Sequence, residues 1–592
     1  MSLSRQPLQI VEIDFDQCTR TYGSAPCTAA LSAETPAKCF NMLFGCQDEA
    51  NFDKGTLTLR FSESQTGLPR GVLVYPALKR VTTNPSEINV AGIDPRSGPM
   101  GKRARVTVSL QDFVDNDTGL DPYQAERRSG AALHSGVGYD PEARGTFFGR
   151  LRRRHPFYLG RALRVREGYA GEALGAMRTR HYVISDWTGP DMAGRVTIEA
   201  KDVLDLADNE KALCPKPSNG SLVAAIPETG LGSFDLKPAT VGDEYETEGR
   251  ARIGSEIVGF TRAGDTITLT KRALDGSTAS AHEAGDLVQQ CFRVEKMPIA
   301  DVASLLLTEY AGIDAGFVPA AQWAAESTYV AALNLTATIT EPTGVASLMG
   351  ELAQLGVAWA WDEVAQEIAM RANRPPGPGE TVPEFSDALN IIEGSLNVED
   401  QPKQRVTQVL VFHGQIDATA DLKKGANYRK AHGAVNNGGN PERYGQDRLV
   451  PVYCRWFGNG NDLVAQVIAE RLAARFKDVP REVTFQIDAK DRELAKPGGL
   501  AVITTRALQD DTGLSLPTQV QITSVEEHAP GHALTVKAVT FAFEGRFVYF
   551  LDSGLAASDY DSAAQADKDF GFYFFDTTQP DFGDGTGGYE FF

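Results

Sequence analysis

The sequence predicts a multidomain, mainly β protein with α+β units, in which small β-barrel or sandwich domains follow an N-terminal four-cysteine segment. Three observations carry this prediction. At 592 residues the chain exceeds what one hydrophobic core supports, so about three to five domains are expected. Its 57 glycines and 31 prolines follow no fixed period, which is typical of many turns. Between those turns, short segments alternate apolar and polar residues, as half-buried strands do.

The first strands are expected on either side of the cysteines. LQIVEIDF precedes Cys18 and TLTLRF covers 56–61, and both alternate with period two. Further short strands recur to about residue 206, and two alternating runs with a closing strand follow between 222 and 295. Helical patterns appear in VASLLLTEYAG, in VASLMGELAQLG and, most clearly, at 461–477, where apolar residues keep the 3.6 period. Strands are expected after it at 482–488, 500–505, 518–525 and 534–543.

These patterns divide the chain into six expected segments. They are a four-cysteine segment at 1–60, a β-rich domain at 61–212, a small inserted β domain at 213–295, an α/β domain at 296–400, a second β-rich domain with the long helix at 401–555, and an aromatic and acidic tail at 556–592. PPGPGE at 375–380 has the composition of a linker.

The cysteines are strongly clustered. Four of the seven, Cys18, Cys27, Cys39 and Cys46, lie within one short stretch, whereas Cys214, Cys291 and Cys454 are isolated. Four local thiols suit a tetrahedral zinc, an iron–sulfur cluster or two disulfides. The spacing lacks the C-x2-C knuckle of common zinc modules and the usual ferredoxin runs, so spacing alone leaves these alternatives open. Disulfides are disfavoured because the other cysteines are odd in number and no apolar segment marks export.

The residues around the cysteines resemble a known family. The run C-T-R-T-Y-G-S-A-P-C, followed by C-F-N-M-x-x-x-C-Q-D, is similar to the cysteine motif of tail-tip (baseplate) hub proteins of long-tailed bacteriophages and gene transfer agents. The resemblance implies a [4Fe–4S] cluster held by Cys18, Cys27, Cys39 and Cys46, with zinc as the alternative. Phe40, Met42, Leu43 and Phe44 are then expected to pack around the cluster.

The resemblance also implies a function and a set of partners. Such a hub is a structural component of the virion tail tip, made in the host cytoplasm. It forms a ring, expected to be a homotrimer, in which two tube-like domains per subunit mimic a sixfold tube. The ring joins the tail tube and distal tail protein to a central fibre or spike and surrounds the DNA exit channel.

Composition and charge limit the other classes of function. The formal charge is −20, from 78 acidic and 58 basic residues, so a surface that grips phosphates is not expected. An acidic wall would instead let DNA pass without specific binding. No apolar run approaches membrane-spanning length and no signal peptide is evident, so we expect a soluble product.

An arginine-rich stretch interrupts the first β-rich domain. Its members are Arg127, Arg128, Arg144, Arg150, Arg152, Arg153 and Arg154, with His155. They suit either an anionic partner or, preferably, pairing with this protein's own carboxylates, within or between subunits. Asp115, Asp117 and Asp121 faintly resemble a calcium loop, but the distal glutamate is missing and an Asx-rich turn is the better interpretation.

The inserted domain resembles a module that recurs in tail proteins. It keeps the expected residue types at seven positions, but alanine stands at 273 where that module usually has glycine. The seven are Arg272, Gly276, Thr278, Ala279, His282, Gly285 and Val288. His282 has no cysteine or second histidine nearby in the sequence, so we expect it to be structural and not a metal ligand.

No sequence motif indicates an enzyme. Gly583, Gly585 and Gly588 satisfy G-x-G-x-x-G, but no helix follows them. Walker, H-E-x-x-H and G-x-S-x-G motifs are missing. A tail-associated cell-wall hydrolase and an iron–sulfur redox or regulatory protein remain as alternative functions. The aromatic residues beyond 556 are expected either to be disordered or to anchor a neighbouring protein.

Overall fold

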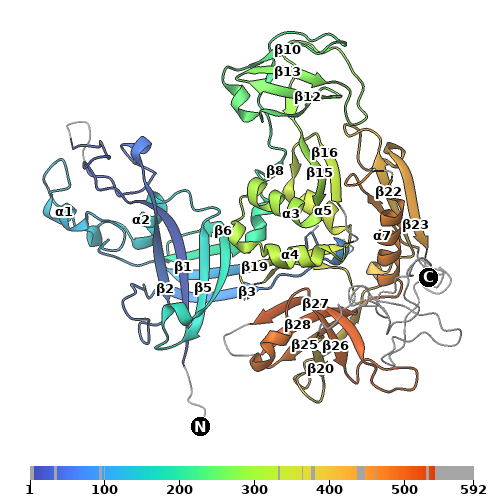
Figure 1. Ribbon diagram of the computed structural model, residues 1–592. Helices are drawn as coiled ribbons and strands as arrows, with labels where there is room; N and C mark the ends of the chain where they lie inside the picture. The colour runs from blue at the N-terminus through green and yellow to red at the C-terminus, as the bar shows by residue number, and fades with distance from the viewer. Residues whose placement is uncertain are drawn as a thin grey trace, which may run out of the picture.

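The computed structural model of the protein describes residues 6–31, 37–92, 97–98, 100–330, 334–362, 365–374, 381–435, 447–458, 460–527 and 533–540. The expected tail at 556–592 and the linker at 375–380 lie outside these residues. The protein is mainly β and multidomain, with several sheets and separate cores. Figure 1 shows these bodies around a central helical region. Within the described residues, no helix is long and apolar enough to cross a membrane.

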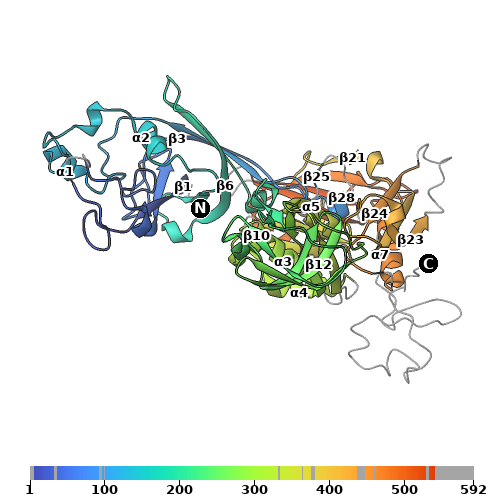
Figure 2. The same cartoon turned by 90° about the horizontal axis from the view of Figure 1, so that it is seen from above.

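The first body is a seven-stranded antiparallel sheet, drawn on the left of Figure 1. Its buried residues meet the apolar face of α2 (Phe147–Arg154), where Phe147, Phe148 and Leu151 are fully buried. A short helix, α1 (Gln124–Ser129), lies outside the sheet, as the two views in Figure 1 and Figure 2 show. In spatial order the strands are β2 (Lys54–Ser62), β1 (Pro7–Cys18), β5 (Ala162–Tyr169), β6 (Arg178–Thr188), β7 (Arg195–Lys201), β4 (Arg105–Gln111) and β3 (Leu78–Asn84).

The inserted body is a six-stranded sheet with its own small core. At its centre Glu256 is fully buried and accepts hydrogen bonds from Arg272 and His282, so His282 has the structural role expected of it. In spatial order its strands are β14 (Val288–Gln290), β11 (Glu248–Ile253), β12 (Glu256–Ala263), β13 (Thr266–Lys271), β10 (Ser233–Lys237) and β9 (Ser221–Leu222).

Gly276 marks where this inserted body meets the next one. Its φ is +85°, and a Cβ there would lie 1.6 Å from the carbonyl oxygen of Ile416. The Ala418 amide also donates to the Asp275 carbonyl, at 3.2 Å. Only glycine permits both the left-handed backbone and this close approach.

The largest core joins helices and three small sheets at the centre of the molecule. Its helices are α3 (Ile299–Leu305), continued by a π-helical turn at Leu306–Tyr310, α4 (Ala320–Ser327) and α5 (Val345–Ala353). Its paired strands are β15 (Phe292–Pro298) with β16 (Asn334–Ile339), β18 (Val357–Asp362) with β19 (Glu367–Ala372), and β8 (Leu213–Cys214) with β17 (Thr343–Gly344).

The same core continues into a sheet and helix further along the chain. β22 (Gln408–Gln415) lies between β23 (Tyr428–Val435) and β24 (Leu449–Tyr453), and α7 (Asp462–Arg475) covers them. Val409, Val411, Ile468 and Leu472 belong to this core. The range 401–555, expected as one domain, therefore contributes to two cores.

The last body is a six-stranded sheet with a separate core. Apart from the parallel pair β20–β26 its neighbouring strands are antiparallel. In spatial order the strands are β20 (Glu384–Ser386), β26 (Leu500–Thr504), β27 (Thr518–Glu527), β28 (Leu534–Thr540), β25 (Arg481–Ile487) and β21 (Asn397–Asp400). Arg178 and Arg180 of β6 pair with Glu527, which joins this sheet to the first one.

Candidate metal centre

The four-cysteine segment leaves the first sheet at one point and returns beside it. Cys18 is the last residue of β1 and lies opposite Lys54, the first residue of β2. The intervening chain is thereby closed at its base by the β1–β2 ladder. The Cys18 amide also donates to the Asn41 carbonyl at 2.6 Å, which brings the second half of the segment back against the first.

Two backbone turns place the remaining cysteines. Asn41 has a left-handed backbone, with φ 56°, and its side-chain amide donates to the carbonyls of Cys18 and Arg20. Gly45 has φ +91° in a turn in which the Cys46 amide donates to the Leu43 carbonyl. Asparagine and glycine are the residues that adopt such positive φ at least cost, which explains why they occupy these positions.

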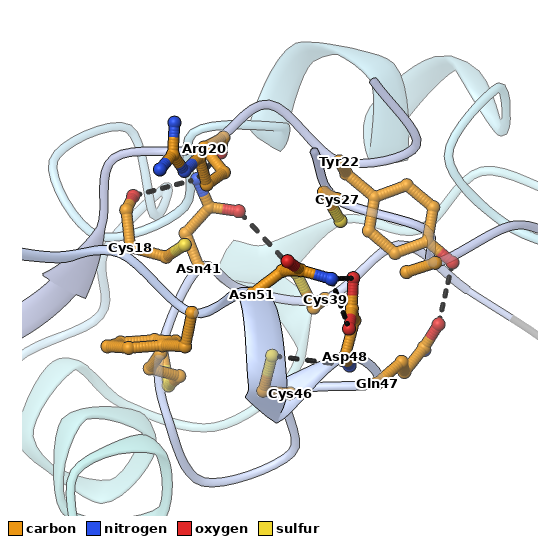
Figure 3. A pocket seen from close by; sticks show the side chains of 13 residues that line it. Cys18, Arg20, Tyr22, Cys27, Cys39, Asn41, Cys46, Gln47, Asp48 and Asn51 are labelled. Carbon is orange, nitrogen blue, oxygen red and sulfur yellow. Dashed lines mark hydrogen bonds between the residues drawn. The ribbon is translucent and has the colours of Figure 1, made fainter. Parts of the chain in front are cut away.

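The structure brings all four predicted cysteines around one pocket, which Figure 3 shows from close by. Tyr22, Ala29, Met42 and Phe52 supply apolar walls, and Arg20, Asn41, Gln47, Asp48 and Asn51 supply polar ones. The cavity between these side chains has a volume of about 20 Å³, which is room for about one water molecule. All seven cysteines lie in the described part of the chain and are free thiols, and the four around the pocket are half-buried.

The four thiol sulfurs do not form a tight cluster. No three of these Sγ atoms lie within 4.8 Å of one another, although all four face the same space. Burial raises the pKa of the Cys39 thiol, and the other three cysteines raise it further by charge repulsion. Burial likewise raises the pKa of Cys46, helped by Cys18, Cys27 and Asp48. Gathering four thiolates here is therefore unfavourable unless a positive centre joins them.

A polar scaffold holds the loop that carries Cys27 and Cys46. Asp48 accepts hydrogen bonds from the Thr28 amide at 2.6 Å, from the Thr28 hydroxyl at 2.9 Å and from Asn51 at 3.1 Å. The Asp48 amide donates to the Cys46 sulfur at 3.5 Å. On the other side, the Tyr22 hydroxyl donates to Gln47 and the Tyr22 amide to the Tyr123 hydroxyl.

Two arginines clamp the loop that carries Cys39. Arg127, 1% exposed, pairs with Asp121 at 2.6 Å and donates to the carbonyls of Lys38 and Cys39. Its guanidinium lies 3.8 Å from the ring centroid of Phe40, and that of Arg154 lies 4.0 Å from the same ring. The Phe40 ring is thus in cation–π contact with two guanidinium groups.

Three members of the arginine-rich stretch, Arg127, Arg150 and Arg154, pair with the chain's own carboxylates. Arg154 donates to Asp117 at 2.6 Å, and Arg150 lies 3.7 Å from the same carboxylate. The Asp117 amide donates to Asp115 and the Tyr123 amide to Asp121, which are the Asx turns expected of these aspartates. The sequence did not reveal that these ion pairs support the cysteine loop, although the carboxylates and arginines were visible as neighbouring clusters.

One expectation about the apolar residues needs correction. Met42 is buried and lines the pocket, but Phe40, Leu43 and Phe44 do not. Leu43 and Phe44 are each 40% exposed, and Phe44 stands against Phe157 and under Arg153. Phe40 instead contacts the two guanidinium groups, and Leu43 and Phe44 come directly before the turn at Gly45.

Comparisons with known proteins give structural neighbours only. No protein-family model matches the sequence, and no curated protein is significantly similar to it. The fold is similar to the 43 kDa tail protein of prophage MuSo2 from Shewanella oneidensis, at 9% identity over 78% of this chain and 97% of that one, with a TM-score of 0.34. A tail protein from Neisseria meningitidis MC58 has 9% identity over 78% and 91%, with a TM-score of 0.36.

A third neighbour is the E. coli c3393 protein, described as a type VI secretion component structurally similar to the phage T4 tail proteins gp27 and gp5. It has 9% identity over 80% of this chain and 76% of that one, with a TM-score of 0.26. The structural neighbours are thus tail and secretion-system proteins. Identities and TM-scores this low carry no argument about what this chain does, which has to come from its own residues.

Proposed function

We propose that this protein is the structural, non-enzymatic hub of the tail tip of a phage or phage-like particle. The single observation that carries the proposal is the four-cysteine segment. Its residues resemble the cysteine motif of the hub family. All four cysteines line one pocket, although Cys46 comes 28 positions after Cys18 in the sequence. The hub would join the tail tube and distal tail protein to a central fibre or spike.

We favour a [4Fe–4S] cluster over zinc because of the resemblance of the cysteine motif and because of the spacing of the sulfurs. In a tetrahedral zinc site with Zn–S bonds of about 2.3 Å, the sulfurs are about 3.8 Å apart. Here no three sulfurs lie within 4.8 Å of one another, which is wider than that tetrahedron. A cluster several atoms wide holds its terminal thiolates farther apart. Cys18, Cys27, Cys39 and Cys46 would be its ligands.

The bound cluster would stabilise the fold of the four-cysteine segment by cross-linking its loops. The segment has only a small core of its own, in which Tyr22 and Ala29 meet Tyr123 and Ala132. When bound, the cluster supplies ligation free energy, which becomes folding free energy for a segment that buries so little apolar surface. The Arg127–Asp121 pair and the Asp48 network hold the loops so that the sulfurs face one space.

A feature of the two large sheets supports a ring of three copies. Asp202, directly after β7, caps the 3₁₀ helix Val203–Asp208, and Asp488, directly after β25, caps the 3₁₀ helix Ala489–Leu494. The same strand–aspartate–3₁₀ unit thus recurs in both sheets. Two related units per subunit, repeated threefold, would present six units to a sixfold tube, and closed rotational symmetry is the usual solution for such rings. Particles with one or six copies per tip would contradict this.

The charge suits a channel through which DNA passes without specific binding. The chain carries a net charge of −20, and Arg127, Arg150 and Arg154 are paired with aspartates inside the first body. A channel wall lined by Arg150–Arg154 in an assembled particle would overturn this part of the proposal. The aromatic tail beyond 556, outside the described residues, would anchor a neighbouring tail protein.

The test is anaerobic purification followed by iron and sulfide analysis of single variants. Cys18→Ser, Cys27→Ser, Cys39→Ser and Cys46→Ser should each lose iron and sulfide and fail to enter particles. Cys291→Ala, at a buried thiol far from the pocket in sequence, is the matched control and should keep both. A colourless wild-type protein holding one zinc would overturn the cluster, and wild-type assembly of all four serine variants would overturn the hub role of the segment.

A further inference from the structure

A second group of potential ligands lies far from the cysteines, between α7 and the strands that it covers. His413 belongs to β22, His432 belongs to β23, and Asp462 is the first residue of α7. One nitrogen from each imidazole and one carboxylate oxygen all lie within 4.8 Å of one another. Figure 1 shows α7 running beside β22 and β23, which explains how residues distant in the chain meet.

The strand register puts both histidines on one face. In the antiparallel β22–β23 pair, Val411 lies opposite His432 and His413 lies opposite Lys430. Because side chains alternate along a strand, these four point to the same side of the sheet. Val411 is part of the core that includes α7, so this is the side that the helix covers. The first turn of α7 then brings Asp462 to the two imidazoles.

His413 is oriented as a metal ligand. It is fully buried, and its Nδ1 lies 3.2 Å from the carbonyl oxygen of Gly458, which can only accept a hydrogen bond. Nδ1 therefore carries the proton and donates it, so that Nε2 of the neutral ring presents a lone pair. Within the part of the chain that the structure describes, Nε2 has no hydrogen-bond partner, and it lies 3.4 Å from Oδ1 of Asp462. Two lone pairs opposed in this way repel each other unless a cation lies between them.

The other two groups complete the arrangement. His432 Nε2 lies 3.2 Å from the same Oδ1, while Oδ2 of Asp462 accepts a hydrogen bond from Lys430 Nζ at 2.5 Å. Lys430 thus holds one oxygen and leaves the other for a ligand, as outer-shell partners commonly do. The side chains of His432 and Asp462 are 31% and 44% exposed, so the site opens to solvent.

Two of the three distances between the ligand atoms match those of a first coordination shell. In a tetrahedral site with metal–nitrogen and metal–oxygen bonds of about 2.0–2.1 Å, ligand atoms are about 3.3–3.4 Å apart. The two nitrogen–oxygen distances of 3.4 and 3.2 Å are of this size. Two imidazoles with one carboxylate suit zinc and neighbouring transition metals, whereas magnesium and calcium prefer oxygen ligands.

We propose that His413, His432 and Asp462 bind a divalent transition-metal cation, with zinc as the ion that fits best, at a site separate from the four-cysteine pocket. Solvent fills the remaining coordination position through the open side. The ion ties the start of α7 to the β22–β23 hairpin. It therefore stabilises the second half of the largest core, and this inference does not depend on the hub function.

The experiment uses the full chain and zinc itself. Zinc-edge X-ray absorption should show an ion coordinated by nitrogen and oxygen only, and titration calorimetry should give one such site per chain. Cobalt at the same site should lack the thiolate-to-metal charge-transfer band that a cysteine site would show. The X-ray absorption spectrum and the cobalt spectrum therefore distinguish this site from a site formed by the four thiols.

His432→Gln and Asp462→Asn are the test variants because both side chains are partly exposed and their replacement spares the core. Loss of an outer-shell partner lowers metal affinity by roughly 10–100-fold. Loss of a direct ligand should lower the affinity for zinc by more than that. His134→Gln and Asp511→Asn, at exposed positions elsewhere, are the matched controls and should bind as wild type does.

Two results would overturn the proposal. One is a wild-type chain that binds no zinc outside the cysteine pocket. The other is unchanged binding by His432→Gln and Asp462→Asn with circular dichroism equal to that of wild type. His413→Ala is a weaker test because His413 is fully buried and its loss would leave a cavity, so the two partly exposed ligands decide the outcome.

Discussion

Replacing Arg127 by methionine should release the loop that carries Cys39. Arg127 is 1% exposed and forms a buried ion pair with Asp121, whose side chain is 0% exposed. Removing one partner of such a pair costs about 3–5 kcal/mol because the other charge is left buried and unpaired. The carbonyls of Lys38 and Cys39 also lose their donor, and the Phe40 ring loses one of its two guanidinium contacts. Methionine retains much of the arginine volume, so the loss is of charge and hydrogen bonds.

The effect should be local and should be measured locally. Amide hydrogen exchange of peptides covering 37–46 should accelerate by at least about a hundredfold, which corresponds to about 3 kcal/mol of local opening. Iron should then be lost faster to a chelator, since loop opening exposes Cys39. Arg128→Met, at the exposed neighbouring position, is the control and should leave both rates unchanged. Protection equal to wild type in a correctly folded Arg127→Met protein would refute the clamp.

Three further predictions concern other parts of the chain. Burial by itself would raise the pKa of Glu256, but hydrogen bonds from Arg272, His282 and two backbone amides outweigh it and lower the pKa from 4.5 to about 2. The inserted sheet should therefore keep this stabilisation above pH 4.5, and its free energy of unfolding should fall by about 3 kcal/mol as the pH falls towards 2. Hydrogen exchange corrected for intrinsic rates measures this loss. A Glu256→Gln protein with the same dependence of stability on acid pH would contradict the prediction. Gly276→Ala should loosen the contact between the inserted body and Ile416, so that amide hydrogen exchange at 416–418 becomes faster. Gly285→Ala is the control, because its new Cβ meets no neighbour among the described residues but the backbone there has a similar positive φ. Equal exchange rates in the two variants would contradict the steric explanation. Deleting the residues after 556 should leave the body folded but weaken attachment of a neighbouring tail protein, so unchanged particle assembly and infectivity would refute an anchoring role.

Local features of the chain could be predicted because local sequence decides them. Period-two alternation in LQIVEIDF and TLTLRF corresponds to β1 and β2, and the 3.6 period at 461–477 corresponds to α7, because hydrophobic periodicity reflects which face of one element is buried. The mainly β class followed from the same patterns. The four cysteines are close in the chain, so their clustering was visible without a fold.

Other features depended on residues that only the tertiary structure brings together. Arg127 and Arg154 meet Phe40 across more than 80 positions of sequence, and His413, His432 and Asp462 come from two strands and a helix. The division of 401–555 between two cores likewise depends on which apolar faces meet. A one-dimensional pattern shows that a face is apolar or that a side chain is charged. Packing among distant segments decides which partner covers that face or pairs with that charge. The sequence by itself therefore determined that four thiols lie close together. Only the tertiary structure decided that Arg127 and Arg154 hold the Cys39 loop and that His413, His432 and Asp462 meet.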